Sequence, residues 1–318
     1  MSEPPRFRSC GEAAGRLWIA IAALCFSPLS HGADWPQWRG PDESGMAREP
    51  VAPNSDIEIL WDSRIGKGFS GVSVANGLAY TMGSDGSEET VWCFDADSGE
   101  LRWKDSYSAA LLPNLHEGGP ASSPTITGDR LFTMSKDGLA SCYEAQSGAS
   151  IWKKNLGRPP EWGFSGSPYL FQSGEVLFEV GATVSLRRKD GELSWKSSAF
   201  KPGYGSPIRF DFAEKPYLAV LKNDELVILD SKGKTIAKHP WKTAFATNAT
   251  TPIVAGEFIF VSTGYARGCV LLRFTGSSLK EVYQNEAMSN HMNNSVLIDG
   301  YLYGFDGTAH RGPSTQFA

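Results

Sequence analysis

The chain of 318 residues has few cysteines and no excess of positive charge. Only Cys93, Cys142 and Cys269 lie beyond the first 33 residues. Three widely spaced cysteines indicate neither a disulfide framework nor a zinc motif, and a small buried side chain in a strand is the favoured interpretation. Lys and Arg number 30 against 35 Asp and Glu, which gives a net charge of −5. A general nucleic-acid binder needs a basic face, so this balance argues against nucleic acid as a partner.

The chain also lacks an apolar run of the ~20 residues that a membrane-spanning helix requires. Its longest run, over residues 17–26, follows three arginines and precedes the small residues Ser30, Gly32 and Ala33. This order predicts a secretory signal over residues 1–33 and an exported, periplasmic or extracellular protein. No transmembrane segment is expected after cleavage, and an uncleaved signal anchor is the alternative that the pattern leaves open.

Glycine and tryptophan are plentiful, with 34 and 10 residues, and both belong to an internal repeat. The clearest copy starts at Ser123-Pro124, passes through the turns Asp137-Gly138 and Ser147-Gly148, and ends at Trp152. Its short apolar segments between tight turns predict strands, with about four per copy of ~40 residues. Such a unit is typical of a β-propeller blade, and the Ser-Pro segment is expected to begin the innermost strand. Related copies start near residues 74, 167, 206 and 251, and a sixth opens at 296–303.

A tryptophan at the end of each copy is expected to fill the wedge between neighbouring sheets. These predicted structural residues are Trp61, Trp103, Trp152 and Trp195. The fourth copy has lost its tryptophan, and residues 59–61 are predicted to form the last strand of a blade. We therefore expect an all-β propeller over residues 57–318, with about five to six four-stranded blades, preceded by an extended arm over residues 34–56.

The segment from Asp95 to Lys104, which reads Asp-Ala-Asp-Ser-Gly-Glu-Leu-Arg-Trp-Lys, resembles the PQQ-like (pyrroloquinoline quinone) β-propeller repeat. Residues 34–41 and 299–306 are similar to segments of exported PQQ-binding-like propeller proteins of environmental bacteria. The resemblance implies WD40-like blades, seven or eight to a full ring, so the propeller is expected to be truncated in its last blade. It also implies two functional classes, quinoprotein dehydrogenases and scaffolds of outer-membrane protein assembly, between which the fold does not choose.

An active quinoprotein is expected to hold PQQ beside calcium, and many carry two adjacent cysteines, which this chain lacks. Asp95 and Asp97 superficially resemble the start of a calcium loop, but the corresponding turns of other copies show that this is a blade turn. The Gly-x-Ser pattern at Ser165 lacks the final glycine of a nucleophile elbow. We therefore predict no catalytic residue and no metal ligand, while a PQQ–calcium site made of dispersed side chains stays open.

Two histidines are candidate binding residues, because both occur in connections that precede a copy. His116 and His291 are predicted to line one opening of the central channel, and hydrogen bonding to the backbone is the alternative. In the arm, Trp35, Trp38 and Arg39 form either a recognition surface or, as favoured here, a segment that packs across the propeller.

These patterns favour a non-catalytic extracytoplasmic binding or scaffold module with a protein partner or a cell-envelope component. The alternative is a PQQ-dependent oxidoreductase similar to quinoprotein alcohol dehydrogenases, or a degenerate relative that only binds the cofactor. A carbohydrate-binding role rests on the exposed aromatic residues alone.

Overall fold

The computed structural model describes residues 32–49, 58–112 and 118–307, and the backbone of residues 316 and 317. The chain divides into two units, Met1–Gly32 and Ala33–Ala318, and all of the described strands belong to the second. Nearly all of the predicted signal lies outside the described residues. All regular elements of the described residues are strands, which confirms the all-β prediction. Within these ranges no helix has the length and apolar character to cross a membrane.

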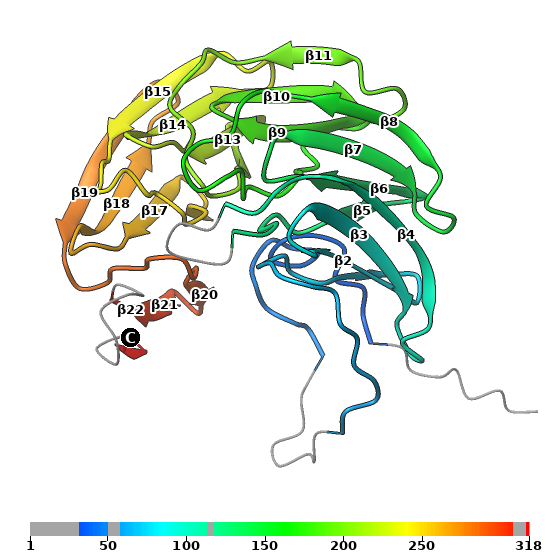
Figure 1. The fold of residues 1–318 in the computed structure, drawn as a ribbon. Helices are drawn as coiled ribbons and strands as arrows, with labels where there is room; N and C mark the ends of the chain where they lie inside the picture. The colour runs from blue at the N-terminus through cyan, green and yellow to red at the C-terminus, as the bar shows by residue number, and fades with distance from the viewer. Residues whose placement is uncertain (1–31, 50–57, 113–117, 308–315, 318) are drawn as a thin grey trace, which may run out of the picture. The chain divides into compact units, whose positions relative to one another are not determined.

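Five antiparallel sheets and a sixth, shorter one follow one another along the chain, and we call them blades 1 to 6 (Figure 1). Blades 1 and 2 contain β1 (Ser73–Ala75), β2 (Leu78–Ser84), β3 (Glu88–Asp95), β4 (Leu101–Ser108), β5 (Thr125–Thr127), β6 (Arg130–Met134), β7 (Leu139–Glu144) and β8 (Ser150–Asn155). Blades 3 and 4 contain β9 (Glu175–Val180), β10 (Ala182–Arg187), β11 (Leu193–Lys196), β12 (Ile208–Phe212), β13 (Lys215–Leu221), β14 (Glu225–Asp230) and β15 (Thr235–Pro240). Blades 5 and 6 contain β16 (Ile253–Ala255), β17 (Phe258–Thr263), β18 (Gly268–Phe274), β19 (Leu279–Asn285), β20 (Val296–Ile298) and β21 (Tyr301–Tyr303). A separate pair, β22 (Phe305–Asp306) and β23 (Gln316–Phe317), follows.

In each complete blade the strands pair in sequence order, so the first strand lies at one edge and the fourth at the other. Blade 3 departs from the four predicted strands because its first strand is reduced to a single bridge between Tyr169 and Leu177. The N–H and the carbonyl of Tyr169 both bond to Leu177, and no further residue pair extends this strand.

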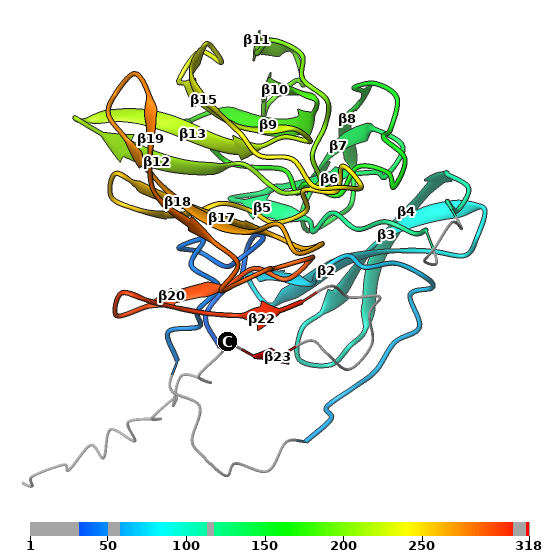
Figure 2. The ribbon, with the colours of Figure 1, turned by 90° about the vertical axis from the view of Figure 1, so that its left-hand side faces the viewer.

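The hydrophobic core lies between the blades. Four clusters of buried side chains each combine residues of two consecutive blades, from blade 1 to blade 5. In a fifth cluster, the partly buried Leu297 and Leu302 of blade 6 pack against buried residues of blade 5. At the first interface, for example, Tyr80 and Val91 of blade 1 pack with Leu131 and Tyr143 of blade 2. A single sheet has two apolar faces, and stacking on both neighbours removes both faces from water. Figure 2 shows β20 following the sheet of β17 and β18 in this way.

Four tryptophans are each seated on a turn glycine of the blade that follows them in the chain. The indole N–H of Trp103 donates to the carbonyl of Ala145 at 2.8 Å, and the ring lies where a side chain on Gly148 would be, 2.5 Å from a Cβ built there. The rings of Trp61, Trp152 and Trp195 lie in the same way on Gly99, Gly191 and Gly233. The Trp195 indole differs in its hydrogen bond, because it donates to the Glu175 carboxylate at 3.1 Å and not to a backbone carbonyl. Turn glycines with φ near +70° thus let a large aromatic ring approach the backbone closely.

Blade 4 has Ala237 at the tryptophan position, opposite Ile228. Its interface with blade 5 is filled by other aromatic residues. The ring of Phe274 lies 5.4, 5.1 and 5.0 Å from the rings of Phe210, Phe212 and Tyr217. The repeat therefore keeps the aromatic filling and changes which strands supply it.

One prediction at the start of the propeller, a last blade strand over residues 59–61, needs correction. Ile59 and Leu60 are 81% and 73% exposed and belong to no strand, although Trp61 occupies the seat on blade 1. No described strand lies beside residues 59–61, so their backbone has no partner with which to form a sheet. At the other end, Tyr283 stands at the tryptophan position of blade 5 and is 40% exposed, against 9% for Trp103. Among the described residues, the outer part of blade 5 has no covering sheet.

Candidate functional site

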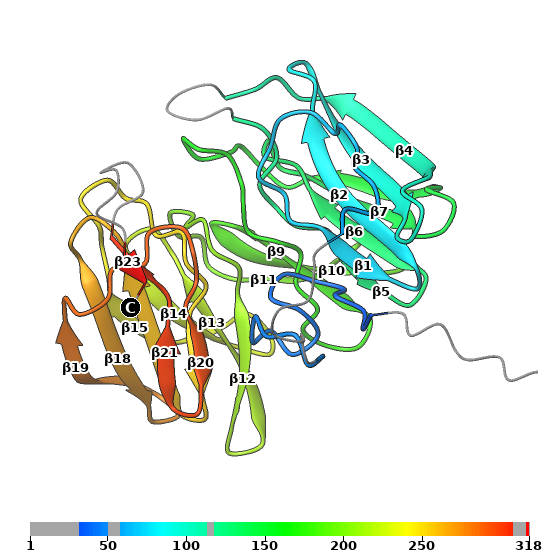
Figure 3. The ribbon, with the colours of Figure 1, turned by 90° about the horizontal axis from the view of Figure 1, so that it is seen from below.

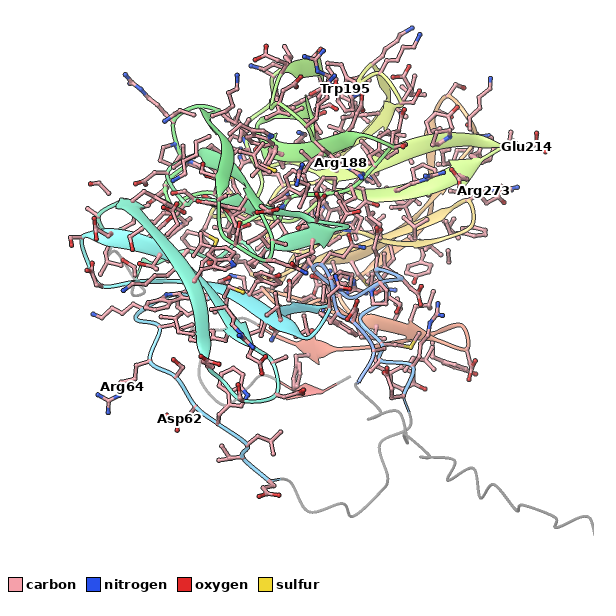
Figure 4. The ribbon with its side chains drawn as sticks, turned by 90° about the vertical axis from the view of Figure 1, so that its right-hand side faces the viewer. Asp62, Arg64, Arg188, Trp195, Glu214 and Arg273 are labelled. Atoms are coloured by element: carbon pink, nitrogen blue, oxygen red, sulfur yellow. The ribbon has the colours of Figure 1, made fainter. Side chains whose placement is uncertain are left out.

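Because the strands of each blade run antiparallel in sequence order, the loops between them lie alternately at the two ends of the sheets. Turns between the second and third strands share one end with the connections between blades, and we call it the connection end. Turns between the first and second strands lie at the opposite end, which we call the turn end. Figure 4 shows Glu214, in the β12–β13 turn, and Arg273, late in β18, at the same end of their sheets. A site at either end therefore combines loops from several blades.

The described part of the arm, residues 34–49, runs along the first strands of several blades (Figure 3). Trp35 pairs with Val74 of β1, and the carbonyl of Pro36 accepts a 2.8 Å hydrogen bond from the N–H of Ile126 in β5. The indole N–H of Trp38 reaches the Thr251 hydroxyl at 3.3 Å. The arm thus packs across the inner edges of the blades, as the favoured interpretation of its aromatic residues expects.

Arg39 and Glu43 fix the turn of the arm, and both have the left-handed backbone that side chains rarely adopt, with φ of 65° and 59°. The Arg39 guanidinium is 9% exposed and donates to the carbonyls of Glu43, Ser44 and Ser295 at 2.9, 2.8 and 3.2 Å. Burial raises the pKa of Glu43, and a 2.7 Å hydrogen bond from the Tyr169 hydroxyl opposes that rise. Strained residues held by many contacts often mark functional positions.

A hollow of about 340 Å³ lies beside this turn. Its walls come from the arm, β12, β16 with its turn, and β20; they include Arg39, Glu43, Arg209, Asp211 and Leu297. The volume is at the lower end of the ~300–1,000 Å³ typical of ligand sites. A second space, near Trp38, measures only about 10 Å³ and is too small for more than one water molecule.

At the connection end, two connections between blades and the β17–β18 turn carry an aromatic cluster. The rings of Phe245 and Tyr265 lie 4.6 Å apart, and Tyr265 meets His291 edge to face at 4.6 Å. Phe245 is 65% exposed, and Met292, next to His291 in the chain, is 60% exposed. We call Phe245, Tyr265, His291 and Met292 the aromatic platform.

The backbone beneath the aromatic platform is held firmly. The side-chain nitrogen of the buried Asn248 lies 2.9, 3.0 and 2.8 Å from the carbonyls of Lys222, Asn223 and Trp241. The Trp241 indole donates to the Thr263 hydroxyl at 3.0 Å, and the Arg267 guanidinium stacks 3.6 Å from the indole ring. Residues 246, 265 and 266 are left-handed without being glycine. The platform is therefore a preformed surface on strained, well-tied loops.

The two candidate histidines have different outcomes. His116 lies outside the described residues, so their predicted meeting at one opening stays a prediction. His291 is 6% exposed, and its ring lies within 3.0 Å of the place that a side chain on Gly264 would fill. It serves as the buried support of Tyr265 in the aromatic platform.

Among the described residues, no group of three His, Cys, Asp or Glu side chains could hold a metal ion. The three cysteines are free and buried, as predicted, and burial raises the pKa of Cys93 and of Cys142 to about 12. Thiols with such pKa values are poor nucleophiles and metal ligands.

Buried charges join neighbouring blades at the connection end. The Lys222 ammonium contacts the Glu179 carboxylate at 2.6 Å, and both side chains are 1% exposed. The ammonium also donates to the carbonyl of Gly181 at 2.9 Å and the Thr183 hydroxyl at 3.2 Å. Burial lowers the pKa of Lys222, and the adjacent Glu179 opposes that effect. The ammonium thus has three acceptors, one for each of its N–H groups. We therefore interpret this pair as structural and not as a reaction site.

Blades that seat a tryptophan on the next blade's turn glycine define a PQQ-type β-propeller, in agreement with the resemblance seen in the sequence. The family described as "Outer membrane protein assembly factor BamB" matches residues 87–311, more than half of the chain. The chain belongs to this family. None of the curated proteins matches it.

Solved structures share the fold at low identity. BamB from Moraxella catarrhalis has a TM-score of 0.59 and 16% identity over 75% of this chain and 70% of that chain. Quinohemoprotein alcohol dehydrogenases from Pseudomonas putida and Comamonas testosteroni have TM-scores of 0.58 and 0.56 and identities of 12% and 13%, each over 86% of this chain and 57% of theirs. This chain thus spans little more than half the length of these dehydrogenases. Identities this low establish the fold and leave the activity open.

Proposed function

We propose that the chain is a non-catalytic extracytoplasmic binding or scaffold module. Its aromatic platform would dock a protein partner or another component of the cell envelope. The observation that carries the proposal is the platform itself, in which Phe245 and Met292 are more than half exposed on a tied backbone. Exposed aromatic and methionine side chains on rigid loops are typical of interaction hot spots.

Two further observations support this proposal. The family is described as an outer-membrane protein assembly factor, and an assembly factor works by binding other proteins. The order of charged, apolar and small residues before position 34 is that of an export signal, which supports a location outside the cytoplasm.

Site-specific photocrosslinking tests the proposal. A benzophenone amino acid in place of Phe245 keeps an aromatic ring at the position and is expected to give a discrete, light-dependent adduct in the envelope of the producing cell. Leu193, 59% exposed on β11 of blade 3, is the matched control and is expected to give none. Equal adducts from both positions, or none from Phe245, would contradict docking at the platform.

The oxidoreductase alternative is tested separately by titrating the purified chain with PQQ and calcium. Quinone absorbance monitors the titration. We expect it to show no saturable binding, and we expect no rise in the Tm of the chain. Saturable binding with a higher Tm would favour the cofactor-dependent alternative instead.

A further inference from the structure

We propose that the hollow beside the arm is a binding site for a single neutral, polyhydroxylated ring, such as a monosaccharide. The hollow is independent of the aromatic platform. Gly256, in the turn before β17, lines the hollow, whereas Tyr265 of the platform follows β17. The two surfaces therefore lie at opposite ends of the same strand, and either can fail without the other.

The charges of the walls exclude an ion as the favoured ligand. Asp211 is paired with Arg209 at 3.0 Å, and Asp42 is paired with the Arg48 guanidinium, whose Nε lies 2.7 Å away. Glu43 receives the Tyr169 hydroxyl and has a raised pKa. No carboxylate is left bare for a cation, and the carboxylates offset the guanidinium charges that would attract an anion.

The same groups suit hydroxyls well. A paired arginine and carboxylate present N–H donors and oxygen acceptors side by side, and a sugar hydroxyl needs one of each. Arg209 and Asp211 have side chains 42% and 57% exposed, so they can bond to a ligand without breaking the fold. Such bonds position a neutral ring and contribute modest affinity.

The hollow is also lined by apolar side chains. They include Ile253 and Val254 of β16 and Leu297 of β20. A sugar ring has one C–H face and a rim of hydroxyls, so it can place the face on these aliphatic side chains and the rim on Arg209 and Asp211. The volume of about 340 Å³ suits one ring and not a polymer.

The arm gives the site its shape. Left-handed Arg39 and Glu43 turn the chain over the hollow, and the Arg39 guanidinium joins this turn to the Ser295 carbonyl ahead of β20. The wall is thus preformed and needs little reorganisation when a ligand enters.

The test is saturation-transfer NMR on the full chain with glucose, galactose, mannose and N-acetylglucosamine, with phosphate and acetate as ionic competitors. We expect saturation transfer from the protein to at least one sugar and a Kd of about 1–10 mM, as for one small ring in an open site. Neither ion should displace the sugar. No transfer to any of the four sugars, or displacement by either ion, would overturn the proposal.

Two double variants and one single variant locate the binding. Replacing the pair by R209L with D211L should weaken sugar binding at least ~10-fold, because the hydroxyls lose their partners. Arg187 and Asp190 of blade 3 form an exposed ion pair of the same kind, with 2.9 Å between the guanidinium and the carboxylate. R187L with D190L is therefore the control and should leave binding unchanged. Ser44→Trp, which fills the hollow without changing its charge, should abolish binding while Tm stays near that of the parent. Equal losses in the two double variants, or full binding by Ser44→Trp, would place any sugar elsewhere and overturn the proposal.

Discussion

Glu89 on β3 has a side chain buried where blades 1 and 2 meet, without solvent exposure. The Tyr107 hydroxyl donates to its carboxylate at 3.1 Å. Burial raises the pKa of Glu89 above 4.5, the positive charge of Lys136 opposes that rise, and the nearby Asp137 adds to it. A charged carboxylate at this position is therefore a cost to the folded state at neutral pH.

This cost predicts a pH dependence. Between pH 4.5 and the higher pKa of the folded state, the native protein binds more protons at Glu89 than the unfolded chain does. The contribution of Glu89 to the free energy of unfolding therefore falls as pH rises through this window, by up to about 1.4 kcal/mol per pH unit. Glu89→Gln should remove this fall, so its stability relative to the parent should increase from about pH 4 to pH 7.

Chemical unfolding at several pH values measures the effect. Glu100→Gln is the control, because the Glu100 side chain is 70% exposed, and its profile should run parallel to that of the parent. A parallel profile for Glu89→Gln as well would show that the burial of Glu89 carries no proton linkage.

At the scale of the blade, stability depends on how each tryptophan meets the next sheet. Gly148 has φ +72°, and a Cβ there would lie 2.5 Å from the Trp103 ring. Gly128, in the β5–β6 turn, has φ +58° with nothing within 4 Å of a Cβ. Both glycines avoid backbone strain, but only Gly148 also makes room for a neighbouring blade.

Gly148→Ala should therefore destabilise the chain more than Gly128→Ala. The control should cost about 1–2 kcal/mol for the left-handed backbone alone. Gly148→Ala should add about 1–3 kcal/mol for displacing a packed ring. Denaturant unfolding compares the two, and equal losses would mean that the Trp103 ring yields without cost.

The sequence was sufficient to predict this blade contact and insufficient to predict the functional surfaces. Trp103 and Gly148 recur at a regular period, so the strands, the turns and the family are visible in the chain itself. The aromatic filling between blades 4 and 5 is not, because Phe212 and Phe274 stand outside the tryptophan position. Ser123, Ser167 and Ser206 each precede a proline, and this pattern predicted only the start of a strand. It did not reveal that the serine hydroxyls accept hydrogen bonds from the preceding blade.

The site was less predictable, for a physical reason. Phe245 and Met292 come from two connections and Tyr265 from the β17–β18 turn. These loops share no sequence motif, and only the stacking of blades brings them to one end. The left-handed backbone at Tyr265 carries no glycine that would reveal it. Trp38 and Arg39 were noticed in the arm, but the hollow beside them depends on β12, β16 and β20, which are far away in the sequence.

At the scale of the whole propeller, a series of hydrogen bonds joins the starts of all six blades around the inner edge. The N–H of Gly71 donates to the Ser123 hydroxyl at 3.1 Å, and Ser123 donates in the same way to Ser167 at 3.0 Å. The series continues from Ser167 to Ser206 at 3.0 Å and from Ser206 to Thr251 at 3.3 Å, and it ends with Thr251 donating to the Asn294 side chain at 3.4 Å. Each blade thus supplies the acceptor that the previous blade lacks, because residues at these edges have no further strand beside them.

Ser167→Ala should interrupt this series in the middle. The Ser167 side chain is buried, so its loss leaves the Ser123 N–H without its acceptor and inaccessible to water. We expect a loss of about 1–3 kcal/mol in the free energy of unfolding, the cost of a buried donor without a partner. Ser108→Ala, at an exposed site at the end of β4, should change stability by less than about 0.5 kcal/mol.

Amide hydrogen exchange gives the local readout: the Ser123 amide should exchange faster in Ser167→Ala than in the parent, while amides of blade 5 keep their rates. Unchanged exchange at Ser123 would show that the inner edge is held by the arm and the blade cores without help from the hydroxyls.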